Sequence, residues 1–181
     1  CFGGRSEGYC DSFGGGDSIK RTIRVNQAPV GKTPRSTIVS YLGIFDEIRS
    51  LFAKTGVARK MKIGASLFSM NVKGGRCECC QGTGMQKIEL NYLPSTYIPC
   101  PECGGKRFNE KVLTVTYQGM TILDVLETPI FELTDVFKGD AKVHSVLSSM
   151  MELGLGYVRL GQMSMSLSGG EAQRIKLARA L

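Results

Sequence analysis

The sequence predicts a mixed α+β fold with several amphipathic helices and a short β-hairpin, and three observations carry this prediction. Apolar residues recur at helical spacing in segments 41–54 and 143–153. Apolar and polar residues alternate from 85 to 93, as in a half-exposed strand. Hydrophobic residues make up 42% of the 181 residues and charged residues 22%, which argues against a disordered chain and against a coiled coil.

The two helical segments each place their apolar residues on one face. In the first segment, Phe45, Ile48 and Phe52 fall on the same side of a helix. In the second, valine, leucine and methionine side chains repeat at helical spacing up to Gly154, which is expected to end the helix. The methionines are expected to belong to the core.

Two further helices are predicted from their first residues. Thr121 is a suitable N-cap for a short helix that contains Ile122 and Val125. Thr128 followed by Pro129 matches an N-cap with proline at the first helical position.

Four segments are predicted to be strands. Residues 21–25 form a short one, and 85–93 alternate in polarity. Residues 95–99 can return antiparallel to that strand after a leucine–proline corner, which gives the hairpin. Residues 111–117 make the last strand, which a Gln-Gly pair ends. The glycine-rich segment 1–20 is expected to be a loop or linker.

Charge and hydropathy limit the partners. Lys and Arg number 23 against 16 Asp and Glu, a net charge of +7 that permits an anionic partner. Segment 48–77 contains no acidic residue, so it is either a solvated basic loop or an anion-binding surface. No apolar run is long enough to span a membrane. The candidate contacts to duplex DNA are Arg59, Lys60, Lys62, Lys73, Arg76 and Lys87.

Five of the seven cysteines lie between positions 77 and 103, and four of them form two Cys-x2-Cys pairs. Such a pair makes a tight knuckle, and two knuckles complete a tetrahedral shell of four thiolates around Zn²⁺. Glycines after each pair permit the positive φ angles of the knuckle turns. The predicted ligands of one structural zinc ion are Cys77, Cys80, Cys100 and Cys103.

Other uses of these thiols fit less well. Cys79 would leave a one-residue spacer, too short for a knuckle. Four protein ligands leave no open position for a catalytic zinc, and an iron–sulfur cluster suits this spacing less well. An odd number of cysteines without a signal sequence argues against a secreted disulfide framework. Clustered thiols therefore predict a reducing, cytoplasmic compartment.

A second candidate site lies at the start of the final predicted helix. Ser168 can cap this helix, and Glu171 stands three residues later, as a capping box requires. Gly169 and Gly170 carry no side chains and leave the N–H groups of the first turn open. A helix N-terminus with open donors binds anions, phosphate among them.

An apparent phosphate loop at Gly31-Lys32-Thr33 is rejected. The motif needs an earlier glycine where Asn26 stands, and Pro34 follows where the phosphate-binding helix should begin.

Several strings in this chain carry a family resemblance. LSGGEAQRIKLARAL resembles the signature motif of the ATP-binding-cassette ATPases. VNQAPVGKTPRS, FSMNVKGGRCECCQGTG, LPSTYIPCPECGGKRFN and GLGYVRLGQMSMSLSGGEAQR lie in the order and at the spacing of the UvrA family. The resemblance covers residues 21–181. UvrA proteins are the damage-recognition ATPases of bacterial nucleotide excision repair.

The resemblance implies a role for each matching residue. Gln27 aligns with the Q-loop glutamine, which reaches Mg²⁺ and the attacking water. The signature residues are implied to contact ATP on an opposing cassette, and they are Ser168, Gly169, Gly170, Glu171 and Gln173. The four paired cysteines align with zinc ligands, and segment 85–98 aligns with a hairpin that handles DNA.

The resemblance also implies an organisation and partners. Residues 1–35 would end an ATP-binding lobe, 36–165 would form a zinc-bearing signature domain, and 166–181 the signature motif and helix. The parent protein is implied to be a homodimer that binds duplex DNA and a UvrB-like partner and uses ATP and Mg²⁺. No Walker A motif precedes Gln27 and no Walker B motif follows Leu181, so we expect this segment alone not to hydrolyse ATP.

Three alternatives remain at this point. Asn26 and Ala28 depart from the usual Asp and Ser beside the Q-loop glutamine, which leaves a UvrA-like paralogue in drug resistance. A DnaJ-like zinc-binding module without nucleotide chemistry would need four cysteine repeats. A transporter-type cassette would lack a zinc module before its signature motif.

Overall fold

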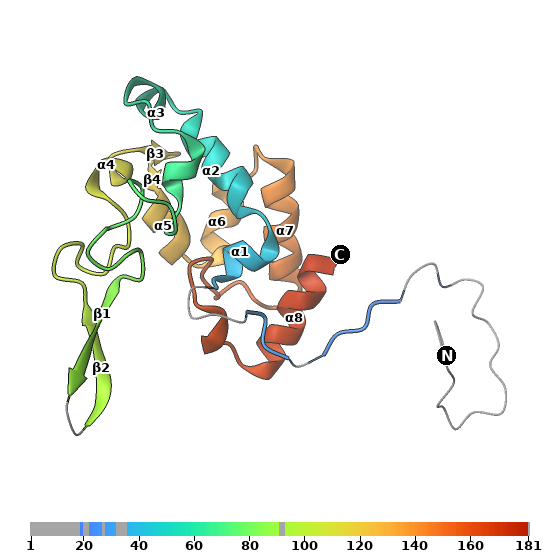
Figure 1. The fold of residues 1–181 in the computed structure, drawn as a ribbon. Helices are drawn as coiled ribbons and strands as arrows, with labels where there is room; N and C mark the ends of the chain where they lie inside the picture. The colour runs from blue at the N-terminus through green and yellow to red at the C-terminus, as the bar shows by residue number, and fades with distance from the viewer. Residues whose placement is uncertain (1–18, 20–21, 27, 32–35, 91–92, 181) are drawn as a thin grey trace.

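The computed structural model describes residues 19, 22–26, 28–31, 36–90 and 93–180. Short helices pack into a helical body, and a long two-stranded hairpin projects from it (Figure 1). The predicted α+β class is confirmed. None of the helices in the described ranges has the length and apolar composition that a membrane crossing requires.

Helices make up most of the regular structure. In chain order the helical elements are α1 (Ile38–Leu42), α2 (Phe45–Ala53), α3 (Gly56–Lys60), η2 (Ala65–Phe68), α4 (Glu110–Leu113), α5 (Ile122–Glu127), α6 (Ile130–Val136), α7 (Ala141–Glu152), η3 (Ser164–Ser166) and α8 (Gly169–Ala180). Two antiparallel pairs complete the fold: β1 (Met85–Leu90) with β2 (Leu93–Pro99), and β3 (Thr116–Tyr117) with β4 (Met120–Thr121).

An aromatic cluster forms the centre of the helical body. The ring of Phe52 lies 5.4 Å from Phe68 and 5.9 Å from Tyr117, and Tyr117 stacks on Phe137 at 5.8 Å. Phe52, Phe68 and Phe137 are fully buried. These contacts join α2, η2, β3 and the end of α6, so segments far apart in the sequence share one apolar core.

The helix predicted over 41–54 is divided in two. Gly43 has a φ of +74°, a left-handed conformation that ends α1, and α2 begins two residues later. The prediction of one continuous helix was therefore wrong. The predicted inward face is confirmed, because Phe45, Ile48 and Phe52 are all buried.

The strand predicted over 111–117 is helical in its first three residues, 111–113. The side chain of Asn109 accepts a hydrogen bond from the backbone N–H of Lys111 and starts α4, so alternation in polarity gives way to a local cap. Only Thr116 and Tyr117 form a strand, which turns back at Gln118 and Gly119.

Two other expectations also need correction. Residues 22–25 form no strand, and residue 21 lies outside the described residues. Pro129 is the N-cap of α6 and not its first residue, because the Thr128 N–H still bonds Asp124 and closes α5. The predicted N-cap at Thr121 is confirmed, and Asp124 completes a capping box with it.

The β1–β2 hairpin is confirmed, with Met85 opposite Pro99 and Ile88 opposite Thr96. Several of its apolar side chains are exposed. Ile88 is 38% exposed and Tyr97 is 62% exposed. Tyr92 lies outside the described residues.

Candidate functional site

The four predicted cysteines meet at the base of the hairpin. Their sulfur atoms all lie within 4.8 Å of one another. The sulfurs of Cys77 and Cys100 are 3.9 Å apart, and those of Cys80 and Cys103 are 3.7 Å apart. A tetrahedral ion with Zn–S bonds of about 2.3 Å requires S···S separations of about 3.8 Å. The four cysteines form a cluster of the size that holds a metal ion.

Glycines let the two knuckles approach closely. Gly82 has a φ of +82°, and a Cβ there would lie 1.9 Å from the carbonyl oxygen of Met70. Gly84 has a φ of +77°, and a Cβ there would lie 2.7 Å from the carbonyl oxygen of Gly105. The positive φ angles expected after each pair are present, at Gly82, Gly84, Gly104 and Gly105. A side chain at Gly84 would push the two knuckles apart.

The backbone prepares the cluster for thiolates. Backbone N–H groups of Cys103 and Glu102 point at the sulfur of Cys100 and lower the pKa of its thiol to about 6. The Gly84 N–H lies 3.3 Å from the sulfur of Cys80. Burial acts in the opposite sense and raises the pKa of Cys77 to about 12. A bound cation would offset this burial cost, because metal ligation deprotonates thiols.

Cys79 is not one of the four clustered cysteines, as the sequence predicts, although its thiol interacts with that of Cys100. Its side chain is exposed, and the side-chain amide of Gln86 donates a hydrogen bond of 2.9 Å to its sulfur. Arg107 follows the second cysteine pair, and its Nη1 donates to the carbonyl oxygen of Gly161 in the body (3.2 Å). Arg107 therefore joins the cysteine knuckles to the helical body, a contact for which the sequence has no periodic signal.

The start of α8 has the predicted capping box. The Ser168 N–H donates to Glu171 at 2.7 Å, and the Glu171 N–H donates to the Ser168 hydroxyl at 3.3 Å. A Cβ built on Gly169 or Gly170 would meet nothing within 4 Å in the described part of the chain. The first turn of this twelve-residue helix is therefore open to a ligand that accepts hydrogen bonds from backbone N–H groups.

Glu171 has a second partner that sequence reasoning missed. The Tyr157 hydroxyl donates a 2.5 Å hydrogen bond to it, which lowers the pKa of Glu171 and raises that of Tyr157. Gln173 lies half-buried two residues further along α8. Gln27, predicted as the Q-loop residue, and Lys32 and Thr33 of the rejected phosphate loop lie outside the described residues.

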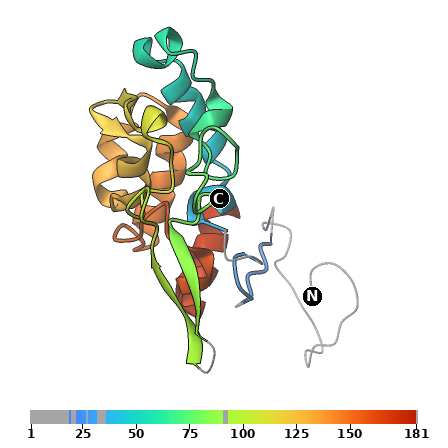
Figure 2. The same ribbon diagram turned by 60° about the vertical axis from the view of Figure 1, so that its left-hand side comes forward.

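The predicted basic residues do not form one surface. Arg59 and Lys60 are exposed on α3, and Lys62 follows them. In both views α3 lies at one end of the molecule and the hairpin that carries Lys87 at the other (Figures 1 and 2). Lys73 is exposed in the loop that leads to the cysteines.

Two of the basic residues also have acidic partners. Arg76 lies 3.5 Å from Glu78, and Lys87 lies 2.7 Å from Glu89. The acid-free segment ends one residue before Glu78. The residues around α3 are consequently the strongest candidates for contacts with an anionic partner.

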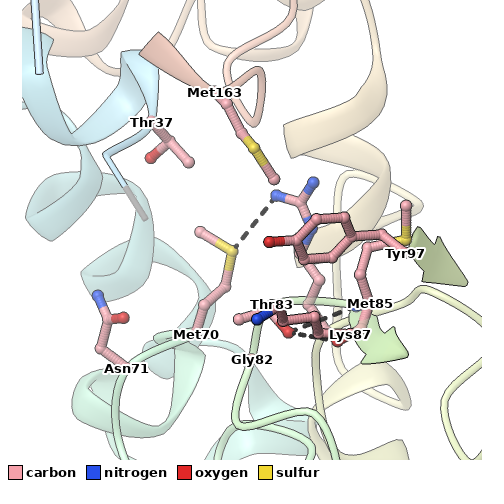
Figure 3. Close-up of a pocket in the computed structure, with 10 residues that line it drawn as sticks. Thr37, Met70, Asn71, Gly82, Thr83, Met85, Lys87, Tyr97 and Met163 are labelled. Carbon is pink, nitrogen blue, oxygen red and sulfur yellow. Dashed lines mark hydrogen bonds between the residues drawn. The ribbon is translucent and has the colours of Figure 1, made fainter. Parts of the chain in front are cut away.

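A cavity of about 740 Å³ lies between the base of the hairpin and the body. Figure 3 shows the thioethers of Met70 and Met163 on the body side and the ring of Tyr97 on the hairpin side. The sequence carries no signal for this cavity, because its lining comes from six separate segments.

The fold and the site place the chain in a class of protein: mixed helical and small-sheet domains with a four-cysteine cluster that could bind zinc. No family model matches the chain. The chain is 47% identical over 174 residues to UvrABC system protein A of Staphylococcus aureus strain N315 and of Staphylococcus epidermidis strain ATCC 12228. Each match covers 96% of this chain, which spans 18% of the length of these relatives.

A solved structure gives the same result. The crystal structure of UvrA2 from Deinococcus radiodurans matches with a TM-score of 0.81 and 52% sequence identity, over 88% of this chain and 20% of that one. The resemblance of this segment to the UvrA group is therefore confirmed. It is also the match expected from the signature and cysteine strings.

Proposed function

We propose that this chain is the signature and zinc-binding part of a UvrA-type ATPase that recognises DNA damage in nucleotide excision repair. One observation carries the proposal: the capping box at Ser168 opens the first turn of α8 without side chains at Gly169 and Gly170. In a homodimer of cassettes this turn would face the γ-phosphate of ATP bound opposite. The identity over nearly the whole chain favours this function over a DnaJ-like module or a transporter cassette.

Within this proposal each predicted residue has a chemical task. The N–H groups of Gly169 and Gly170 donate to phosphate oxygens, and Glu171 holds the cap. Gln173 lies one helical turn from the phosphate, and Gln27 reaches Mg²⁺ and the attacking water. The signature turn is half of a composite site, so this segment alone does not hydrolyse ATP, since a few backbone donors cannot offset the cost of holding a nucleotide.

The cysteine cluster is proposed to hold one zinc ion. The S···S distances fit tetrahedral zinc, and the fully buried Cys100 sulfur receives backbone N–H groups. Its role is structural because four protein ligands leave no open position. The ion fixes the hairpin, and a reducing cytoplasmic compartment keeps the thiols available.

Duplex DNA is the proposed partner of the exposed basic residues around α3, with the hairpin as a second contact region. A UvrB-like partner is proposed for the parent protein on the resemblance alone. A UvrA-like paralogue in drug resistance remains the second candidate, because Asn26 and Ala28 depart from the usual Asp and Ser beside the Q-loop glutamine. The intact protein that contains this segment is expressed in a bacterium that lacks UvrA. Restored survival after ultraviolet irradiation supports the repair function. Drug resistance without restored survival supports the paralogue.

The test of nucleotide chemistry uses the intact protein that contains this segment. Ser168→Arg places a long side chain over the open turn, and we expect ATP hydrolysis to fall at least about a hundredfold, as when a transition-state donor is lost. Ser145→Arg on the exposed face of α7 is the matched control and should retain activity. Unchanged turnover in Ser168→Arg contradicts the proposal.

A further inference from the structure

Three hydrogen bonds join α8 to the segment around position 27. The Lys176 ammonium donates to the backbone carbonyl of Asn26 (3.0 Å), to the Asn26 side-chain oxygen (2.6 Å) and to the backbone carbonyl of Ala28 (2.5 Å). An ammonium group has three N–H donors, and these contacts use all of them. The partners are about 150 residues away in the sequence, so this contact is purely tertiary.

The segment has few other attachments. Residues 22–26 and 28–31 form neither helix nor strand, so no ladder of backbone hydrogen bonds holds them. Val30 is buried in the core. A Cβ on Gly31 would lie 2.4 Å from that of Ser36, which shows close packing after Val30. Before Val30, the hydrogen bonds found in the described residues run to Lys176.

We propose that Lys176 is a positioning residue that holds the chain on both sides of position 27 against α8. The first turn of α8, which starts at Gly169, contains the open N–H groups, and Lys176 lies about 10 Å further along the same helix, at 1.5 Å per residue. A helix moves as a rigid rod over two turns. Movement of the signature turn toward phosphate would therefore carry Asn26 and Ala28 with it.

The anchoring is a property of this chain, whereas its consequence for catalysis rests on the proposed function of Ser168 and Gln27. Charge strengthens the contact, because hydrogen bonds from an ammonium are about twice as strong as neutral ones. Asn26→Asp would add an ion pair at the same place. Lys176→Met keeps the length of the side chain and removes all three donors.

The first experiment measures backbone order in this chain by ¹⁵N relaxation. In Lys176→Met we expect the order parameter of Ala28 to fall from about 0.85 to below about 0.6, while that of Val30 stays high. Lys176→Arg retains donors for the same carbonyls and should preserve most of the order. Arg179→Met is the matched control, because Arg179 lies on the same helix but contacts the ring of Tyr41.

The anchoring is overturned if Ala28 keeps its order in Lys176→Met, or loses as much in Arg179→Met. A double-mutant cycle that combines Asn26→Asp with Lys176→Met gives an independent test of the anchoring. Asn26→Asp should slow the motion of Ala28 only when Lys176 is present, and an equal effect in Lys176→Met also overturns the anchoring.

The second experiment measures ATP hydrolysis by the intact protein. Lys176→Met should lower kcat about tenfold, the size of one charged hydrogen bond, and leave KM within about twofold, with recovery in Lys176→Arg. If the unmodified protein hydrolyses ATP and Lys176→Met is equally fast, the positioning role is overturned. If the unmodified protein hydrolyses none, the proposed function fails, and the relaxation experiment decides the anchoring by itself.

Discussion

The metal module, defined here as residues 76–108, and the helical body are stabilised in different ways. The body buries phenylalanine, isoleucine and leucine side chains from most of its helices in one core. Phe108, the last residue of the module, belongs to the core of the body, and the separate buried cluster within the module consists of the cysteines. Its hairpin exposes both Ile88 and Tyr97. The body can fold by burying apolar surface, whereas the module has little such surface to bury.

This difference sets where each region gets its stability. Each fully buried aliphatic or aromatic side chain of the body contributes about 1.5–3 kcal/mol relative to an exposed one. A structural zinc site contributes on the order of 10–16 kcal/mol, but only when the metal is present. The stability of the body is therefore expected to depend on its buried apolar side chains, and the stability of the module on its metal ion.

Metal removal is the sharpest test of this contrast and has the largest expected effect. We expect one zinc ion per chain. Chelation or Cys100→Ser should unfold the module and leave the body helical, because the module loses its main source of folding energy. Elemental analysis gives the metal content, and hydrogen exchange over 76–108 and over α7 separates the two regions.

Cys79→Ser is the matched control, since Cys79 is exposed and lies outside the cluster. It should retain the metal. A metal content well below one per chain in the unmodified protein, or full retention in Cys100→Ser, contradicts the site.

A substitution in the core should destabilise the body, whereas metal removal destabilises the module. Phe52→Ala removes a fully buried ring that contacts Phe68 and Tyr117, and we expect it to lower the free energy of unfolding by about 3–5 kcal/mol. Urea denaturation followed by far-ultraviolet circular dichroism measures this loss.

Phe131→Ala is the control for the core, because Phe131 is 52% exposed. Its effect should stay within about 0.5 kcal/mol. Equal losses in the two variants would show that the body does not depend on its buried aromatic cluster.

The sequence predicted the features that depend on local spacing. The hairpin, the knuckle glycines and the caps at Thr121 and Ser168 each require a few residues at fixed positions, and each is present. The spacing of the cysteine pairs also predicted that their four sulfur atoms lie together, because two Cys-x2-Cys knuckles complete one four-thiolate shell.

The sequence mispredicted elements where two local patterns, such as apolar spacing and a capping residue, favour different structures. Gly43 divides a segment whose apolar spacing continues across it, and Asn109 starts a helix where polarity alternates. The contacts of Arg107 and Lys176 join residues more than 50 positions apart without any repeating pattern. Such contacts follow from the tertiary fold, so no local reading of the sequence could supply them.

DNA binding should distinguish the α3 end from the hairpin end. We expect weak, sequence-independent binding of duplex DNA with a log–log salt slope of about −3, for three or four phosphate contacts. Arg59, Lys60 and Lys62 changed together to Ala should remove most of it, because these residues are exposed and close in sequence. Lys87→Ala should do less, because Lys87 already pairs with Glu89. Fluorescence anisotropy at two salt concentrations measures both.

Lys138 and Lys142 changed together to Ala form a control that removes two positive charges from the body, where each lysine lies near an acidic residue. This variant should retain most of the binding. Undetectable binding at about 50 mM salt, or binding unaffected by the triple substitution, would show that segment 48–77 is a solvated loop.

The smallest expected effect concerns the carboxyl that closes the start of α8. The Tyr157 hydroxyl and the Ser168 N–H both donate to Glu171 and hold its pKa below the ordinary 4.5. Tyr157→Phe should raise this pKa toward the ordinary value, and the remaining N–H bond should keep the return incomplete. Carboxyl ¹³C chemical shifts followed by NMR through the acid range measure the change, with Tyr97→Phe on the exposed hairpin as the control.

The pH dependence follows from the signs of the two shifts. The lowered pKa of Glu171 contributes stability above its unfolded value, and this contribution is lost as pH falls through the folded pKa. The raised pKa of Tyr157 contributes stability below its ordinary value of 10.0, and this is lost as pH rises through the folded pKa. The Tyr157–Glu171 contact should therefore stabilise α8 across neutral pH and weaken at both extremes. If the pKa of Glu171 is equal in the unmodified protein and in Tyr157→Phe, this contact does not hold the signature turn.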